Sequence, residues 1–189
     1  MKLLVGLGNP GRKHLLNRHN LGFLAVEAWV LLKGAEFRKE EFGAQTARVK
    51  VGSEEVIVMK PLTFMNRSGE SVGEAMRFFK VAVEDVLVAH DELDIPPMSF
   101  RLKKGGGHAG HNGLRSMSVH GEGYMRLRLG IGRPPHPAMA VADFVLGNLS
   151  EEELKYWENE MQGGISEAID LCLAGNFTTA MNKFNRKEK

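Results

Sequence analysis

Short apolar runs alternate along the chain with segments whose apolar residues recur every three or four positions. Residues 2–7 form an apolar run that ends at Gly8-Asn9-Pro10-Gly11, which predicts a buried strand followed by a loop. Asn17 is a candidate N-cap for a first helix. That helix is predicted from apolar residues at helical spacing: Leu21, Leu24, Ala28 and Leu31.

The middle of the chain shows a hairpin pattern and a second helix. Residues 46–51 and 56–60 flank Gly52-Ser53 and predict two strands joined by a tight turn. The second helix is predicted from the spacing of Val72, Ala75, Met76 and Phe79. Residues 86–89 then form a β-rich apolar run that ends in His90-Asp91-Glu92.

The last part of the chain adds two strands and a helix. Residues 99–103 and 125–131 are predicted strands, and Ser150 with Glu153 forms a capping box. The helix that follows carries Leu154, Trp157, Met161 and Ile165. This alternation predicts an α/β fold with a largely parallel sheet and one antiparallel hairpin.

Functional sites in such folds form beyond the carboxyl ends of the strands. Asn9 and Asp91 both fall just past predicted strand ends. The pattern therefore predicts that these two side chains share one site.

Composition places the chain among ordinary globular proteins. Hydrophobic residues make up 43% and charged residues 25% of 189 residues, which excludes disordered and fibrous classes. The lone Cys172 cannot form an internal disulfide, and no apolar run approaches the roughly 18 residues of a membrane span. We expect a single domain, 1–189, that is soluble, cytoplasmic and not membrane-bound.

Charge is distributed unevenly along the chain. The net charge is +2, yet the segment from Arg101 to Arg133 carries seven basic residues and one acidic residue. A local basic surface on a nearly neutral protein favours a specific phosphate-bearing partner over general adhesion to polyanions. A solvated basic face without a partner is the alternative.

The glycine-rich segment Gly6 to Gly11 matches the dinucleotide-binding pattern G-x-G-x-x-G. That motif requires a helix that begins at the loop, and Pro10 removes one of the backbone donors. No acidic residue follows at the end of the next strand, where a ribose would be bound. The loop is better interpreted as a rigid turn that presents the Asn9 amide.

His19 is the histidine with the clearest chemical context. It lies at the predicted start of the first helix, where the helix dipole disfavours imidazolium and keeps the ring neutral. A neutral ring can act as a general base, and a surface histidine near a cap is the alternative. His108 and His111 could share a metal, but the absence of further ligands favours solvated loop histidines.

Asp91 can orient a histidine and stabilise its charged form. No nucleophile accompanies the pair, because Cys172 lies on the apolar stripe of a late helix and no G-x-S-x-G elbow is present. A histidine and an aspartate without a serine or cysteine indicate activation of water.

Two loops carry side-chain amides, residues 63–66 and 105–113. Amides donate to one group and accept from another, so Asn66 and Asn112 suit ester and peptide groups. Asn112 is alternatively an N-cap, and Phe64 is either a core residue or an apolar wall for a base or side chain.

Together these segments resemble the bacterial-type peptidyl-tRNA hydrolases. The resemblance is carried in order by residues 5–11 (VGLGNPG), 18–22 (RHNLG), 61–69 (PLTFMNRSG), 90–94 (HDELD), 105–114 (GGGHAGHNGL), 126–134 (RLRLGIGRP) and 144–147 (FVLG). It implies cleavage of the ester between a peptide and the terminal ribose of tRNA, without metal or cofactor. It also implies a monomer with a twisted mixed sheet flanked by helices.

The resemblance assigns roles to particular residues. His19 matches the base that activates water, Asp91 the carboxylate that holds it, and Asn9 a residue that recognises the blocked amino group. The remaining matches are residues that contact substrate: Asn66 and Asn112 around the ester, Phe64 at the 3′ end, and Lys103 with Arg128 at the 5′ phosphate of the acceptor stem. His14 stands where the family generally has a tyrosine that contacts substrate.

Two other functions are compatible with parts of the pattern. A non-catalytic RNA-binding protein on the same scaffold would keep the basic surface but would not need His19, Asp91 and the amides together. A nucleotide-dependent enzyme would use the Gly6–Gly11 loop, which lacks the required helix.

Overall fold

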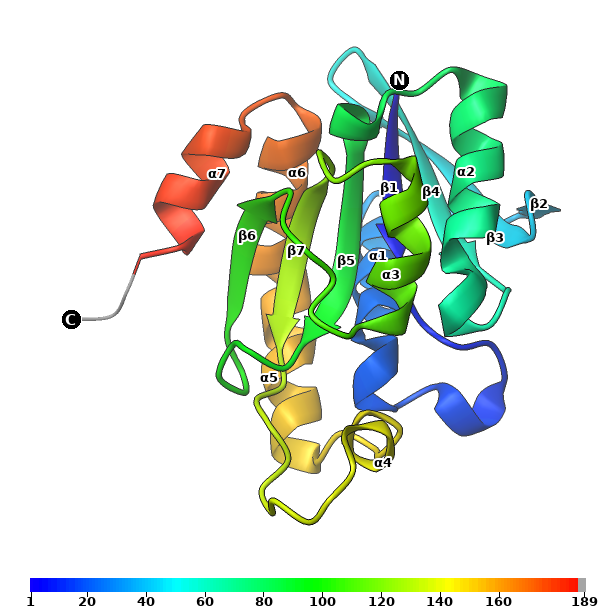
Figure 1. Ribbon diagram of the computed structural model, residues 1–189. Coiled ribbons are helices and arrows are strands. Elements are labelled where there is room, and N and C mark those ends of the chain that lie inside the picture. The colour runs from blue at the N-terminus through cyan, green and yellow to red at the C-terminus, as the bar shows by residue number, and fades with distance from the viewer. Residues whose placement is uncertain (187–189) are drawn as a thin grey trace.

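A seven-stranded mixed sheet organises the chain in the computed structural model, which describes residues 1–186 (Figure 1). The strands are β1 (Lys2–Gly6), β2 (Lys39–Glu41), β3 (Ala44–Val51), β4 (Glu54–Pro61), β5 (Val86–Glu92), β6 (Phe100–Lys104) and β7 (Met125–Gly130). Their order in the sheet is β2-β3-β4-β1-β5-β7-β6. The central strands β4, β1, β5 and β7 are parallel, while the outer pairs β2/β3, β3/β4 and β6/β7 are antiparallel.

Helices cover both faces of this sheet. They are α1 (Leu21–Leu32), α2 (Ser68–Phe79), α3 (Asn112–Met117), α4 (Val141–Val145), α5 (Glu151–Gln162), α6 (Gly164–Leu173) and α7 (Phe177–Phe184). Helices α2 and α3 lie on one face and α1, α5 and α6 on the other, while α4 lies below the carboxyl ends of β5 and β7 (Figure 1). Within residues 1–186, no helix is both long enough and apolar enough to span a membrane.

Five short 3₁₀ helices join the larger elements. They are η1 (Arg12–His14), η2 (Arg18–Asn20), η3 (Met65–Arg67), η4 (Val83–Asp85) and η5 (Ser118–His120). Both η2 and η3 lie directly before a helix, α1 and α2, and each carries a residue of the predicted site.

The two faces of the sheet bury separate cores because successive strand residues point to opposite sides. In β1, Leu4 packs with the residues of α1, α5 and α6, whereas Leu3 and Val5 pack with those of α2 and α3. Trp29 of α1 and Trp157 of α5 are fully buried in the first core. This two-sided burial explains why the central strands have apolar residues in succession rather than in alternation.

Close contact between α1 and the central strands positions the start of that helix. A Cβ atom on Gly22 would lie 2.3 Å from the carbonyl oxygen of Ala89 and 2.6 Å from the amide nitrogen of Leu7. Only glycine permits this approach. It holds η2, which directly precedes α1, against the end of β5.

Most predicted elements are present, with four differences. Strand β5 continues through Glu92, so Asp91 is inside the strand rather than beyond it. Asn17 precedes η2 and is not the N-cap of α1, since a 3₁₀ turn intervenes. The predicted C-terminal helix is two helices, α5 and α6, interrupted at Gly163. Within α1, which forms as predicted, the single residue Leu31 is 76% exposed.

The fourth difference is the antiparallel pair β6/β7, which adds to the predicted hairpin of β3 and β4. Residues 99–103 and 125–131 were each predicted as strands, but apolar patterning does not show how two strands pair. The predicted capping box at Ser150 and Glu153 is confirmed in both directions.

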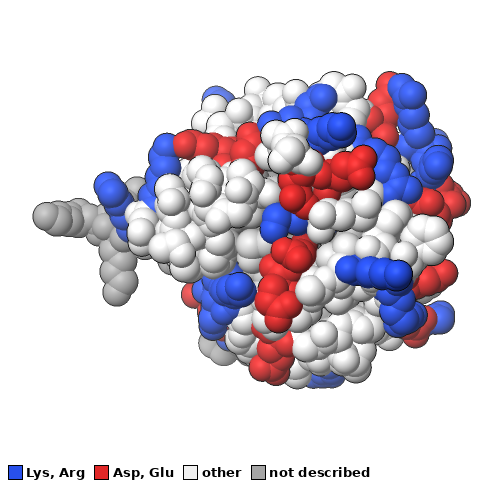
Figure 2. Space-filling view, turned by 90° about the horizontal axis from the view of Figure 1, so that it is seen from above, with Lys and Arg blue, Asp and Glu red and all other residues white. Residues whose placement is uncertain are grey.

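Charged side chains are mixed on the end of the molecule where the N-terminus lies (Figure 2). Lys and Arg are interspersed there with Asp and Glu, without an extended area of one sign. That end is opposite to the carboxyl ends of the parallel strands, where the candidate site forms.

Candidate active site

A pocket of about 580 Å³ opens at the carboxyl ends of β1 and β5, beside α4. Its lining contains three kinds of residue. The first are the titratable side chains of His19, Asp91 and His111. The second are side-chain amides, from Asn9, Asn66 and Asn112. The third are apolar side chains, from Leu93, Val141, Ala142, Val145 and Leu146.

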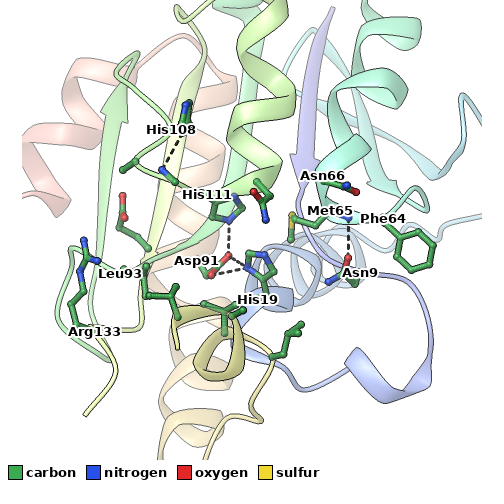
Figure 3. Close-up of a pocket in the computed structure, with 18 residues that line it drawn as sticks. Asn9, His19, Phe64, Met65, Asn66, Asp91, Leu93, His108, His111 and Arg133 are labelled. Atoms are coloured by element: carbon green, nitrogen blue, oxygen red, sulfur yellow. Dashed lines mark hydrogen bonds and ion pairs between the residues drawn. The ribbon is translucent and has the colours of Figure 1, made fainter. Parts of the chain in front are cut away.

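His19 and Asp91 form a buried pair at the centre of the pocket (Figure 3). The Nδ1 atom of His19 lies 2.9 Å and 3.0 Å from the two carboxylate oxygens of Asp91, although the residues are 72 positions apart in the chain. Their side chains are 11% and 2% exposed. The predicted proximity of these two residues is confirmed.

The electrostatics of the pair differ from the prediction made for His19. Burial lowers the pKa of His19, but the charge of Asp91 and its hydrogen bond more than offset burial, so the pKa is raised. The predicted lowering by the α1 dipole is therefore wrong, because His19 lies in η2, before the first residue of α1, and the carboxylate of Asp91 is in direct contact with its ring.

Asp91 accepts a second hydrogen bond from His111, whose ring lies above the carboxylate in Figure 3. The Nε2 atom of His111 lies 2.8 Å from Oδ1, and its ring lies 4.8 Å from that of His19 between centroids. Burial raises the pKa of Asp91, but the two histidines outweigh it and hold the pKa well below the usual range. Asp91 is thus a carboxylate that both rings stabilise.

The backbone of α3 determines which nitrogen of His111 carries the proton. Its Nδ1 atom accepts hydrogen bonds from the backbone N–H groups of Gly113 and Leu114, so His111 is the N-cap of α3. The proton must then lie on Nε2, which donates to Asp91. The interpretation of His111 as a solvated loop histidine is wrong.

The donor atoms of His19, Asp91 and His111 lie within 4.8 Å of one another, a spacing that invites comparison with a metal site. A cation on Nε2 of His111 would displace the ring proton while Nδ1 still accepts two backbone donors. The ring would then be an imidazolate. The three residues are therefore better suited to hydrogen bonding, in which two imidazole N–H groups donate to the carboxylate of Asp91, than to binding a metal ion.

A pair of hydrogen bonds holds the Asn9 loop. The amide of Asn20 donates to the carbonyl of Asn9 and accepts from its N–H, both at 2.9 Å. The side-chain oxygen of Asn9 accepts from the backbone N–H of Met65, also at 2.9 Å. The remaining function of the Asn9 amide is to donate its N–H₂ group into the pocket.

Asn66 and Asn112 are both exposed and both line the pocket. Within residues 1–186, neither side-chain amide bonds another protein group, so both are available to a ligand. Asn112 is the first residue of α3 and not its cap. Phe64 is 63% exposed at the edge of the pocket and is not a core residue (Figure 3).

The apolar lining of the pocket comes mainly from α4 and Leu93, which the sequence pattern did not single out. Arg133 lies near Leu93, across the pocket from Phe64 (Figure 3), and its guanidinium pairs with Asp94. The pocket thus offers both amide groups and an apolar wall to a ligand.

Three predicted substrate contacts lie outside the pocket lining. His14 bonds the side-chain oxygen of Asn17 through Nδ1 at 2.7 Å. Lys103 and Arg128 lie on β6 and β7, where the register pairs Lys103 with Arg126. Arg128 donates to Glu92 at 2.9 Å, so part of the predicted basic surface is neutralised within the protein.

Sequence reasoning missed two residues of the site. His111 was recognisable only as a histidine before a short helix, and its contact with Asp91 spans 20 residues. Asn20 follows His19 directly, yet its contact with the Asn9 loop depends on how η2 folds back. Neither contact has a local sequence signal.

The family model for peptidyl-tRNA hydrolase matches residues 3–189 of the chain. The chain belongs to this family. Among its relatives, a peptidyl-tRNA hydrolase from Cereibacter sphaeroides is 50% identical over 177 residues, which cover 93% of this chain and 78% of that protein. One from Anaeromyxobacter sp. strain K is 42% identical over 194 residues, covering 100% and 98%.

Solved structures of family members share the fold. The crystal structure of peptidyl-tRNA hydrolase from Acinetobacter baumannii is 38% identical, has a TM-score of 0.92, and covers 100% of this chain and 96% of that one. The resemblance inferred from the motifs is therefore confirmed at the level of family and fold.

Proposed function

We propose that this protein hydrolyses the ester that joins a peptide to the terminal ribose of tRNA, with His19 as the base that activates water. The observation that carries the proposal is the buried pair of His19 and Asp91, 2.9 Å apart in a pocket whose lining residues include no serine, threonine, cysteine or lysine. Such a site favours direct attack by water over a covalent intermediate.

The proton positions support this role. Asp91 is ionised and can only accept, so the Nδ1 atom of His19 must carry a proton, and in the neutral ring Nε2 is then the unprotonated nitrogen. In the proposed reaction, Nε2 takes a proton from water while the water oxygen bonds the ester carbonyl carbon. The bond from carbon to the ribose oxygen then breaks, and His19 returns its proton to that oxygen.

Asp91 stabilises the imidazolium formed in the first step, as the raised pKa of His19 indicates. The amides of Asn66 and Asn112 donate to the carbonyl oxygen as it gains charge. The N–H₂ group of Asn9 donates to a peptide carbonyl, which an aminoacyl-tRNA with a free amino group lacks. Phe64 provides an apolar surface for the 3′ end.

Positively charged residues outside the pocket support a proposal for the contacts with tRNA. Lys103 is exposed on β6, and Arg128 is partly exposed on β7 beside it. We assign these two cations to the 5′ phosphate of the acceptor stem, and His14 to the edge of the substrate site. In this proposal the single domain, 1–189, acts as a cytoplasmic monomer and uses no metal or cofactor.

The test is cleavage of a peptidyl-tRNA in a chelator, with wild type and His19→Ala side by side. Loss of a general base lowers turnover by about 10²- to 10⁴-fold, so we expect at least a hundredfold loss in His19→Ala. Binding of tRNA should be nearly unchanged, because His19 makes no phosphate contact in the proposal. Turnover of His19→Ala within tenfold of wild type would remove His19 from the role of base.

The same assay separates the main alternative. A non-catalytic RNA-binding protein would bind tRNA but leave the ester intact in the wild-type sample. Cleavage that requires an added metal would contradict the absence of a cofactor, and would direct attention to the donor atoms of His19, Asp91 and His111.

A further inference from the structure

Arg126 is a buried cation that the proposed reaction does not use. Its side chain is 3% exposed, and it lies on β7 behind the pocket rather than in its lining. Burying a guanidinium is costly unless its donors are satisfied, so its partners indicate what it holds in place. Besides an ion pair with Glu92 at 3.6 Å, those partners belong to two different parts of the site.

The first partner connects Arg126 to the catalytic carboxylate. Its Nε–H donates to Nε2 of His90 at 3.1 Å, and His90 is fully buried. A guanidinium has no acceptor, so the proton of His90 must lie on Nδ1. That Nδ1–H donates to the backbone carbonyl of Asp91 at 2.8 Å. The chain of contacts runs from Arg126 through His90 to the residue that holds His19.

The second set of partners is the glycine loop, residues 105–107. Nη1 of Arg126 donates to the carbonyls of Gly105 and Gly107 at 3.3 Å and 3.2 Å. A Cβ on Gly106 would lie 2.8 Å from Nζ of Lys103 and 3.2 Å from Nη1 of Arg126. Two cations therefore converge beneath this loop, which leads into His111 and Asn112.

We propose that Arg126 is a positioning residue that joins the glycine loop and the adjoining tRNA-binding cation Lys103 to the backbone of Asp91. This inference rests on the proposed function, in which Lys103 contacts tRNA and Asp91 holds the base. Arg126 touches neither water nor ester. It acts through His90, and its hydrogen bonds connect the glycine loop, beside which Lys103 lies, to the residue that holds the base.

The experiment compares two substrates that contain the same ester. One is peptidyl-tRNA, and the other is an N-acetylaminoacyl ester of adenosine, which has no acceptor stem. Arg126→Lys keeps the charge but cannot bond His90 and the loop together. We expect it to lower kcat on both substrates by about 10- to 100-fold, the effect of a small misplacement of catalytic groups. Lys103→Ala should lower kcat/KM on peptidyl-tRNA alone.

A pH profile on the adenosine ester distinguishes positioning from general destabilisation. Asp91 and His111 face His19, and a displaced Asp91 raises the pKa of His19 less. The acid limb should move to lower pH in Arg126→Lys. Asn185→Ala is the matched control, because it removes two hydrogen bonds to Leu102 of β6 without touching the site. Its acid limb should stay in place.

A second variant covers the case in which Arg126→Lys does not fold. His90→Asn keeps a donor near the Asp91 carbonyl but removes the acceptor for Arg126. It should reproduce the loss of kcat on the adenosine ester, and the two substitutions together should cost less than the product of their separate effects. Multiplicative losses would show that Arg126 and His90 act independently.

The outcomes also separate this inference from the proposed function. Wild type that cleaves neither ester overturns the function itself. Wild type that cleaves both, with the kcat of Arg126→Lys unchanged on the adenosine ester, overturns only the positioning role. Equal shifts of the acid limb in Arg126→Lys and Asn185→Ala would reduce Arg126 to a structural residue.

Discussion

Three histidines surround Asp91, and each has a different protonation state or partner. His90 is neutral with its proton on Nδ1, and burial followed by the nearby His111 and Arg126 lowers its pKa. His111 carries a proton on Nε2, which faces Asp91, and accepts backbone hydrogen bonds at Nδ1. Only His19 combines a proton on Nδ1 with a free Nε2 in the pocket. Histidine thus has three roles around Asp91. His19 is the proposed base, His111 bonds the carboxylate, and His90 bonds the backbone carbonyl.

His111→Ala tests the second hydrogen bond to Asp91. The substitution removes a donor to a buried carboxylate and the cap of α3. Hydrogen bonds to charged groups contribute about 1.5–3 kcal/mol, so we expect kcat to fall at least about tenfold. Steady-state kinetics on peptidyl-tRNA measure the change.

His108→Ala is the comparison, because His108 lies in the same loop and bonds only the N–H of Gly110. The decrease in kcat on peptidyl-tRNA should be smaller in His108→Ala than in His111→Ala. Equal losses in the two variants would mean that the loop as a whole, and not the bond to Asp91, accounts for the effect.

Among the elements, the contact between α2 and α3 determines how the two amide loops face each other. A Cβ on Gly69 would lie 2.0 Å from the carbonyl oxygen of Ser116, so only glycine permits this helix contact. The hydroxyl of Ser116 also accepts from the N–H of Gly69 at 2.8 Å. Because α2 follows Asn66 and α3 begins at Asn112, their packing sets the distance between the two amides.

The two residues proposed to contact the 5′ phosphate of tRNA, Lys103 and Arg128, lie on the antiparallel strands β6 and β7. Arg128→Ala removes one cation from this pair of strands. Each phosphate contact contributes about 0.9 to the slope of log affinity against log salt on duplex nucleic acid, so the slope should flatten by about one unit. Binding of tRNA measured over a range of salt concentrations checks this.

A substitution of Glu92 gives a second test of whether Arg128 contacts phosphate. Glu92 pairs with Arg128 at 2.9 Å, so Glu92→Gln should strengthen tRNA binding if Arg128 meets phosphate. An unchanged salt slope in Arg128→Ala would show that Arg128 serves only Glu92.

At the scale of the whole molecule, all the proposed chemistry lies at one edge of the sheet. The parallel strands β1 and β5 end there, and η2, α3 and α4 close around their ends (Figure 1). The opposite end of the molecule carries mixed charges (Figure 2). The site therefore depends on the packing of the entire sheet and not on one segment.

The pair of His19 and Asp91 makes stability depend on pH. The lowered pKa of Asp91 adds stability above the ordinary aspartate value, and this is lost as pH falls through its folded value. The raised pKa of His19 adds stability below the ordinary histidine value, and this is lost as pH rises through its folded value. Both contributions are complete between about pH 4 and 6.5.

Asp91→Asn tests this dependence. The difference in unfolding free energy between wild type and Asp91→Asn should be greatest in that window and should narrow on both sides. Urea unfolding at several pH values measures it. A difference that stays constant from acid to alkaline pH would mean that the pair does not titrate as the structure indicates.

Sequence alone determined most of the central strands and the longer helices, the edge of the sheet that carries the site, and the family. These follow from local properties: apolar spacing, the tight turn at Gly52-Ser53, the capping box at Ser150, and motifs read in order. The pair of His19 and Asp91 was also predictable, because both residues lie in motifs that match the family.

Only the tertiary structure decided which groups surround that pair. His111, Asn20 and the buried Arg126 are ordinary loop or strand residues by pattern, and their partners lie 20, 11 and 36 positions away. Hydrogen bonds of this kind depend on the direction of each side chain after the helices pack. The direction of the pKa shift of His19 also depends on the tertiary structure. The carboxylate of Asp91 raises this pKa because it lies in direct contact with the ring, and its effect exceeds that of the neighbouring helix dipole.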